Sequence, residues 1–257
     1  RAATLPGITD SELKTNSIEI LDPESGLFVS LTNGGSGAIM LGSDVIAAAP
    51  IPANGLDKLS DGPLELETER GVLSVTIEPT GEPVELGGEL LGRRQASRTA
   101  VAGTLTDGDR TIALDCSGVI HSRAGAGDDP ALTRDATIIL ADGGLICLAT
   151  ASPGPGVPHG QEEASAAISH PGGYIDFDEV LLSTEYDSAG RHIRATLELW
   201  PASDEISNLH GAGRVVTGCS ARVGGHAINT ALFSWSLDGH LGMGRYEIST
   251  KLAAVPA

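Results

Sequence analysis

The residues best suited to proton chemistry lie at the end of one predicted strand. The segment from Asp115 to Arg123 closes that strand and runs into a glycine-rich stretch. At this strand–loop junction the His121 imidazole is placed to act as an acid, and Arg123 to clamp a developing negative charge. In strand alternation Asp115 points to the face opposite Leu114. The alternative is a set of exposed polar residues at a strand end.

Two further clusters combine carboxylates with aromatic or small residues. Asp176 and Asp178 share one strand face, where burial would raise one pKa and exposure would leave two solvated charges. Near the C-terminus Gly242 and Gly244 share a face that leaves room for a ligand or a crossing backbone, and Glu247 lies on the other face. These patterns leave each alternative open.

Composition excludes several function classes. The 257 residues carry 16 Lys+Arg against 34 Asp+Glu, a formal net charge of −18 that disfavours nucleic acid and anionic membranes. No apolar run approaches the roughly 18 residues of a membrane helix. Aromatic residues make up 3%, too few for a stacking platform. We expect a soluble bacterial protein of the cytoplasm, because nothing in the sequence argues for export.

No sequence motif predicts a cofactor or a metal. Nucleophile-elbow, phosphate-loop, dinucleotide and zinc-protease motifs are absent, and the seven histidines are scattered. Cys116, Cys147 and Cys219 are widely spaced in apolar or small-residue settings, which indicates small buried side chains rather than nucleophiles.

Period-2 alternation recurs along the chain and helical periodicity is almost absent, which predicts roughly fourteen to sixteen strands. Asp107-Gly108 and Asp238-Gly239 each separate two alternating runs, as in tight antiparallel hairpins. The predicted fold is all-β and antiparallel, either two tandem lipocalin-like β-barrels or a large β-sandwich or barrel. We place the halves at 1–125 and 126–257, with the boundary in the glycine-rich loop 122–130. A second such loop, 152–160, is placed to cover a barrel mouth.

These motifs resemble one family. The stretch Gly118-Val-Ile-His121-Ser-Arg123 and the later Asp-Gly-x-x-Gly-x-Gly-x-x-Glu from Asp238 to Glu247 are similar to the hydroxyneurosporene hydratase/AttH-like group of tandem lipocalin-like barrels. Ile120 stands where the group usually has Asp. The resemblance covers the second half of the first barrel and the end of the second.

The resemblance implies an enzyme that moves a proton on a hydrophobic small molecule such as an isoprenoid, steroid or polyketide, as a hydratase, isomerase or cyclase of secondary metabolism. It assigns acid/base work to His121, charge stabilisation to Arg123, and a second proton-carrying role to Glu247 or Asp115. It implies no cofactor, and it leaves a homodimer open.

Two other hypotheses compete with the enzyme. A non-catalytic carrier of an apolar ligand would have the same cavity with apolar walls. A structural β-protein would have a barrel interior filled by side chains.

Overall fold

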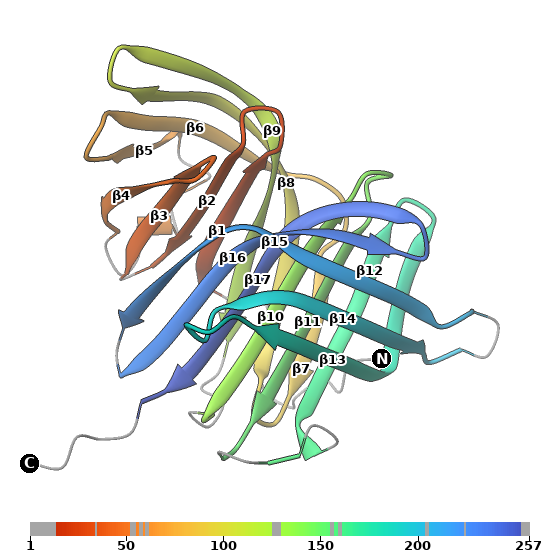
Figure 1. Cartoon of the computed structure of the whole chain (residues 1–257). Coiled ribbons are helices and arrows are strands. Elements are labelled where there is room, and N and C mark those ends of the chain that lie inside the picture. The colour runs from red at the N-terminus through yellow and green to blue at the C-terminus, as the bar shows by residue number, and fades with distance from the viewer. Residues whose placement is uncertain are drawn as a thin grey trace, which may run out of the picture. The chain divides into compact units, whose positions relative to one another are not determined.

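The computed structural model describes residues 14–33, 35–51, 55–56, 59, 62–124, 130–154, 157–158, 161–203, 206–223 and 225–252. Seventeen strands and no α-helix lie within these residues (Figure 1), which confirms the all-β, antiparallel prediction. The count exceeds the expected number because a strand as short as Val84–Gly88, ending in two glycines, shows little alternation. The described part of the chain contains no helix long and apolar enough to cross a membrane.

The chain divides into two compact units, and each unit takes residues from more than one stretch of the sequence. One unit takes the described residues of Thr9–Pro83 and Gln95–Arg123, and the other takes those of Val84–Arg94 and Ala124–Ala257. The first nine strands are β1 (Lys14–Asp22), β2 (Leu27–Thr32), β3 (Ser36–Leu41), β4 (Asp44–Pro50), β5 (Leu64–Glu67), β6 (Val72–Pro79), β7 (Val84–Gly88), β8 (Gly92–Asp107) and β9 (Arg110–Ala124).

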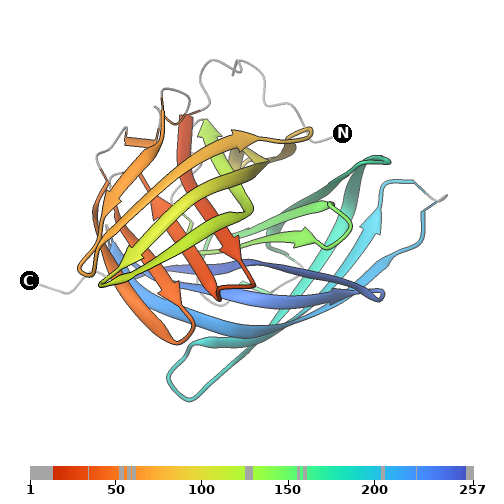
Figure 2. The ribbon, with the colours of Figure 1, turned by 90° about the horizontal axis from the view of Figure 1, so that it is seen from above.

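The N-terminal unit is an open sheet curled around its own core. The strands run in the order β4-β3-β2-β1-β9-β8-β6-β5, so β4 and β5 are its edges. Ile46 of β4 and Leu66 of β5 nevertheless belong to one hydrophobic cluster with Ile18 of β1 and Leu114 of β9. Side chains from both edges can share a core only if the sheet bends into a half-barrel, as Figure 2 shows.

The C-terminal unit is a closed eight-stranded barrel. Its strands are β10 (Leu132–Leu140), β11 (Leu145–Ser152), β12 (Glu163–His170), β13 (Gly173–Tyr186), β14 (His192–Pro201), β15 (Leu209–Val223), β16 (His226–Leu237) and β17 (His240–Lys251). They pair in sequence order, and β17 closes the barrel on β10.

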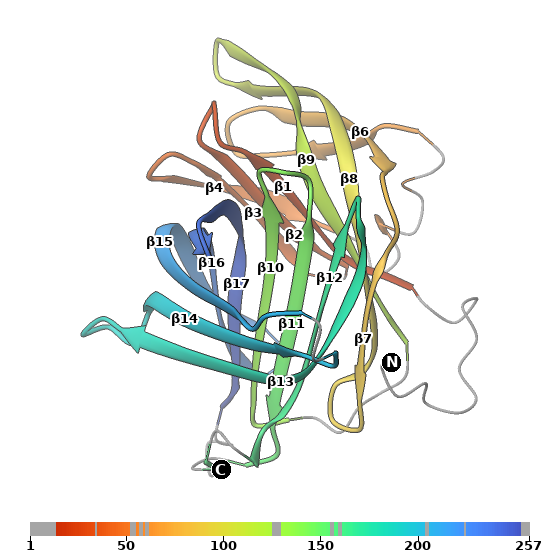
Figure 3. The same cartoon turned by 90° about the vertical axis from the view of Figure 1, so that its right-hand side faces the viewer.

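The β7–β8 hairpin packs on this barrel beside β12 (Figure 3). The Glu163 carboxylate at the start of β12 accepts backbone N–H groups of Leu90 and Leu91 at 2.7 and 3.1 Å. The backbone N–H and carbonyl of Glu85 both bond the Tyr174 hydroxyl. The segment Val84–Arg94, which holds β7 and the start of β8, therefore belongs to the C-terminal unit, although Gln95–Arg123 of the N-terminal unit follow it in the sequence.

Both predicted Asp-Gly hairpins are confirmed. Asp107 ends β8 and the chain turns back into β9 at Arg110. Between β16 and β17, Asp238 and Gly239 both have positive φ, 45° and 90°. This pairing of left-handed residues gives the twist that a two-residue hairpin needs.

Alternation points one face of every barrel strand inward, and the middle of the barrel is filled. Phe233, Trp235 and Tyr246 are fully buried there among Leu, Ile and Ala side chains. Gly244, on the same face as Tyr246, makes room for the neighbouring strand: an added Cβ would lie 1.7 Å from the Thr137 carbonyl oxygen of β10. The backbone of the paired strand β10 therefore takes the space that Gly244 leaves.

Two polar side chains cross this filled middle to β13. Arg134 of β10 donates to the Leu182 carbonyl at 2.9 Å and forms an ion pair with Glu162. Tyr246 of β17 shares a 2.6 Å hydrogen bond with the Thr184 hydroxyl. Strands on opposite walls are thus tied together through the interior.

Candidate functional site

The structure places the three predicted residues of β9 on one face of the strand but does not bring them all together. His121 and Arg123 are neighbours on that face, about 7 Å apart along the strand. Asp115 is exposed and six residues from His121, which is about 20 Å in an extended strand. Asp115 therefore cannot exchange a proton directly with His121.

His121 instead has a carboxylate partner that sequence reasoning missed. Its Nε2 lies 2.6 Å from Oε1 of Glu19 on the paired strand β1. The Glu19 side chain is 1% exposed and that of His121 14%. Both lie on the sheet face opposite Ile18 and Ile120, which belong to the half-barrel core. A carboxylate oxygen can only accept, so the His121 nitrogen that faces Glu19 is one that carries a proton.

Glu247, the fourth predicted residue, belongs to the barrel unit and faces away from the barrel core. It accepts a 2.6 Å hydrogen bond from the Thr230 hydroxyl and lies 3.1 Å from the Arg245 guanidinium. Both carboxylate oxygens are therefore engaged in ties along the outer wall. Asp178 is likewise exposed, which agrees with a solvated outer face for the Asp176–Asp178 pair.

The three cysteines are free, and Cys116 and Cys219 are poor nucleophiles. Burial raises the pKa of Cys116 to about 12, helped by the negative charges of Asp22 and Asp115. Burial and the charge of Glu247 also raise the pKa of Cys219. Both are thiols rather than thiolates at neutral pH.

A hollow of about 500 Å³ opens at one mouth of the barrel. We call it the mouth hollow. Aliphatic side chains make most of its wall, and the aromatic ring of Tyr174 lies among them. The aliphatic members are Leu140, Ile146, Ile168, Ile175, Ile206, Leu209 and Leu237. A volume of this size falls within the range of small-molecule sites, and such a wall retains apolar ligands by burying their surface.

Three ionisable side chains meet at the rim of the mouth hollow. Oδ2 of Asp142, in the β10–β11 turn, lies 3.2 Å from Nδ1 of His240 and 3.5 Å from Nε2 of His170. His240 begins β17 and His170 ends β12. A bond from the Gly144 backbone N–H, at 3.1 Å, lowers the pKa of Asp142, and both histidines lower it further. Asp142 is therefore a carboxylate at neutral pH.

The hydrogen-bond partners assign different roles to the two rim histidines. Nδ1 of His170 accepts the Gly172 backbone N–H at 3.1 Å, so its Nε2 carries the proton that faces Asp142. His170 then has no lone pair left for a substrate. Nδ1 of His240 faces Asp142, so in the neutral ring Nε2 is a base with a carboxylate behind it. Such a pair can accept a proton while Asp142 stabilises the imidazolium that forms.

The sequence contained one signal for this cluster. In a barrel of antiparallel hairpins, alternate turns lie at the same end, so the β10–β11, β12–β13 and β16–β17 turns share a mouth. Asp142, His170 and His240 each lie at one of these turns. Within the described ranges, no group of three or more His, Cys, Asp or Glu side chains is arranged to hold a metal ion.

The predicted loops fall in part outside the described residues. This applies to 125–129 in the boundary loop and to 155–156 and 159–160 in the loop 152–160.

Comparison with known proteins identifies the class of fold. No protein-family model matches the sequence, and no curated protein is similar to it in sequence. Solved structures do match over nearly the whole chain. A protein assigned as AttH from Nitrosomonas europaea has a TM-score of 0.64 at 12% identity, covering 97% of each chain.

Two further solved structures share the same fold. Kievitone hydratase from Nectria haematococca has a TM-score of 0.54 at 11% identity, covering 97% of this chain and 94% of its own. CghA, solved with Sch210972, has a TM-score of 0.50 at 11% identity, covering 95% and 89%. The chain thus has the tandem-barrel fold of AttH-like and hydratase-type proteins, and the resemblance predicted from sequence is confirmed for the fold.

Proposed function

We propose that the protein is a cofactor-independent enzyme that transfers a proton on a hydrophobic small molecule, by hydration, dehydration, isomerisation or cyclisation. The observation that carries the proposal is the mouth hollow, where an apolar wall meets a histidine base backed by a carboxylate. The fold shared with kievitone hydratase supports the hydration class in particular.

The chemistry follows from the positions of the rim residues. An isoprenoid- or polyketide-like molecule would bury its carbon skeleton against Ile146, Ile168 and Leu237. In hydration, His240 Nε2 would take a proton from water while the water oxygen bonds to one carbon of a C=C bond, and would return the proton to the other carbon. In isomerisation, it would take a proton from an activated C–H and return it to another carbon of the same allylic system, so that the double bond shifts. Asp142 would hold the His240 ring in place and balance its transient charge.

The Glu19–His121 pair is the second candidate position for the same chemistry. A half-buried imidazole beside a buried carboxylate fits the acid/base role that the family resemblance gives to His121. Single variants distinguish the two positions because the residues belong to separate units of the chain.

The test begins with native mass spectrometry, to identify the apolar molecule that copurifies with the protein. That molecule is then incubated with the protein in H2(18)O and in D2O. Hydration adds labelled oxygen, whereas isomerisation adds deuterium without oxygen. His240→Ala should abolish label incorporation while leaving binding intact, and Asp142→Asn should slow it by roughly 10²-fold or more, the usual scale of a general-base contribution.

Two other results would contradict catalysis by His240 in the mouth hollow. Loss of label with His121→Ala or Glu19→Gln, and not with His240→Ala, moves the reaction to the β9 position. A bound molecule that the wild-type protein never changes makes the protein a carrier. In either case the assignment of catalysis to the mouth hollow is wrong.

A further inference from the structure

The permanent charge at the rim of the mouth hollow is negative. Asp142 is a carboxylate at neutral pH, and its side chain is 37% exposed there. Among the described residues that line the hollow, none is a lysine or an arginine. The four turns at this end of the barrel add Asp238, and their described residues also contain no lysine or arginine. These turn residues are 141–144, 171–172, 202–203, 206–208 and 238–239.

The side chains paired with Asp142 do not supply a lasting counter-charge. Both are imidazoles, His240 at 3.2 Å and His170 at 3.5 Å. An imidazole loses its charge as the pH rises past neutrality, whereas a guanidinium keeps its charge. Above neutral pH the rim therefore presents a carboxylate beside neutral rings.

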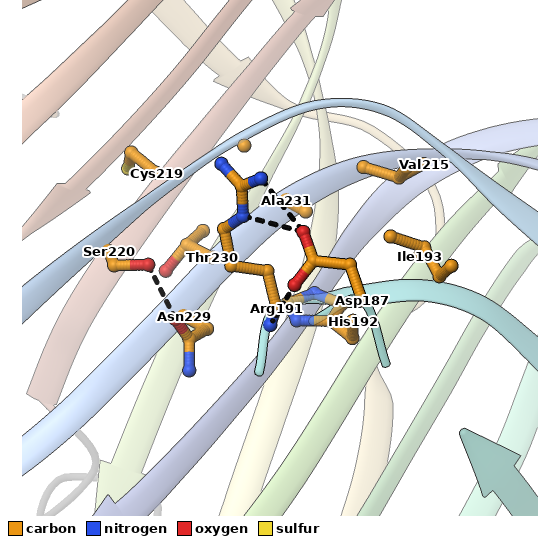
Figure 4. A pocket seen from close by; sticks show the side chains of 11 residues that line it. Asp187, Arg191, His192, Ile193, Val215, Cys219, Ser220, Asn229, Thr230 and Ala231 are labelled. Atoms are coloured by element: carbon orange, nitrogen blue, oxygen red, sulfur yellow. Dashed lines mark hydrogen bonds and ion pairs between the residues drawn. The ribbon is translucent and has the colours of Figure 1, made fainter. Parts of the chain in front are cut away.

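The pocket at the opposite end of the barrel provides a contrast (Figure 4). It lies at the β13–β14 turn, which the alternation of hairpins places away from the mouth hollow, and the two share no lining residue. There Nε of Arg191 donates to Asp187 at 2.9 Å, and a second guanidinium nitrogen lies 2.8 Å from the same oxygen. That carboxylate has a permanent counter-charge in the wall of its own pocket, and Asp142 does not.

The polar side chains of the mouth hollow offer acceptors to a ligand and keep their donors for one another. The Tyr174 hydroxyl is engaged with the backbone N–H and carbonyl of Glu85, and both nitrogens of His170 are engaged as well. What a ligand can reach is the carboxylate of Asp142, whose oxygens each have two lone pairs, and Nε2 of a neutral His240. The polar group of a matching ligand is therefore a donor.

We infer that the mouth hollow takes a hydrophobic amine, whose ammonium group lies beside Asp142 and whose carbon skeleton packs on the aliphatic wall. An ammonium group has three N–H donors and no acceptor, which complements this rim, and its charge is attracted by the carboxylate. The formal net charge of −18 also favours the approach of a cation. As a statement about the substrate the inference rests on the proposed function, but the binding preference is measured without turnover.

The test uses three ligands that share the adamantane cage and differ in charge. At pH 8 adamantylmethylamine is a cation, adamantylmethanol is neutral and adamantanecarboxylate is an anion. Calorimetric titration of the protein with each ligand, at this pH and at low salt, gives three dissociation constants. We expect the amine to bind about fivefold more tightly than the alcohol and the carboxylate about fivefold more weakly, the scale of a partly exposed ion pair. Added salt should reduce both ratios.

A matched pair of variants locates the charge that causes the preference. Asp142→Asn removes the charge at the rim and keeps an amide oxygen for the Gly144 backbone N–H, so the amine and the alcohol should bind equally well. Glu185→Gln removes one negative charge from the same barrel at a position that does not line the hollow. The affinities of Glu185→Gln should therefore follow the wild-type order.

The inference is wrong if the alcohol or the carboxylate binds the wild-type protein as tightly as the amine, or if none of the three ligands binds. It is also wrong if Asp142→Asn keeps the preference for the amine. The wild-type order decides the question even where a variant does not fold. The proposed function fails on a different result, the absence of ¹⁸O or deuterium label in the copurified molecule, so the two failures are distinct.

Discussion

The ion pair between Arg134 and Glu162 offers a direct test of the barrel interior. The Arg134 side chain is 2% exposed and that of Glu162 7%, so both charges are removed from water. Glu162→Gln leaves the guanidinium buried without its counter-charge. Removing one partner of a buried pair costs about 3–5 kcal/mol of unfolding free energy. For a unit of this size, that loss lowers the melting temperature by about 6–20 °C.

The double variant Arg134→Met/Glu162→Gln measures how much of the loss comes from the buried, uncompensated charge of Arg134. It removes the cation and leaves the Leu182 carbonyl without its donor, a penalty of about 1–3 kcal/mol. The double variant should therefore be about 2 kcal/mol more stable than Glu162→Gln alone. Glu185→Gln is the matched control, because its pair with Arg194 is more than half exposed on both sides and should barely change stability.

Urea unfolding followed by tryptophan fluorescence measures these differences. Both tryptophans of the chain, Trp200 and Trp235, lie in the barrel unit, so the signal reports on that unit alone. The reasoning fails if Glu162→Gln unfolds at the wild-type urea concentration. It also fails if the double variant is no more stable than the single one.

Three further predictions concern packing and protonation. Gly244→Ala pushes a Cβ against the Thr137 carbonyl and should cost about 1–3 kcal/mol or more in the urea assay, whereas Gly154→Ala, whose Cβ meets nothing closer than 3.8 Å, should be tolerated. Because burial lowers the pKa of His192 below 6.5, the unfolded chain binds a proton there that the folded chain does not. Unfolding free energy should thus fall as pH drops from 7 to 5, and His192→Gln should make the fall shallower; an unchanged slope contradicts this. Cys116, with its pKa at about 12 instead of 9.0, should react with iodoacetamide at pH 8 roughly 10³-fold more slowly in the folded than in the unfolded chain, and equal rates would show that it is not protected.

Local features of the sequence predicted the fold well. Alternation and the Asp-Gly turns specify strands and hairpins because both depend on residues close together in the chain. The motif around His121 indicated the tandem barrels. Neither could show that Val84–Arg94 packs on the C-terminal barrel, because that contact depends on Glu163, more than 70 residues away.

Site residues were harder to predict, because their contacts also join residues that are far apart in the sequence. Glu19 and His121 meet only because β1 pairs with β9, and Glu19 lies in a strand with no recognisable motif. Asp142 and His240 come from turns almost a hundred residues apart. Asp115, by contrast, seemed close to His121 in sequence, yet an extended strand carries the two far apart.

The hydrogen bonds of Arg134 and Tyr246 across the barrel affect how a molecule can enter and leave the mouth hollow. Among the described residues Phe233 and Trp235 fill the centre of the barrel, so a molecule in the mouth hollow has packed side chains on its inner side. A ligand must then enter and leave the mouth hollow through the same opening. A product that stays bound in the mouth hollow would exclude the next substrate molecule, so product inhibition should be competitive with substrate.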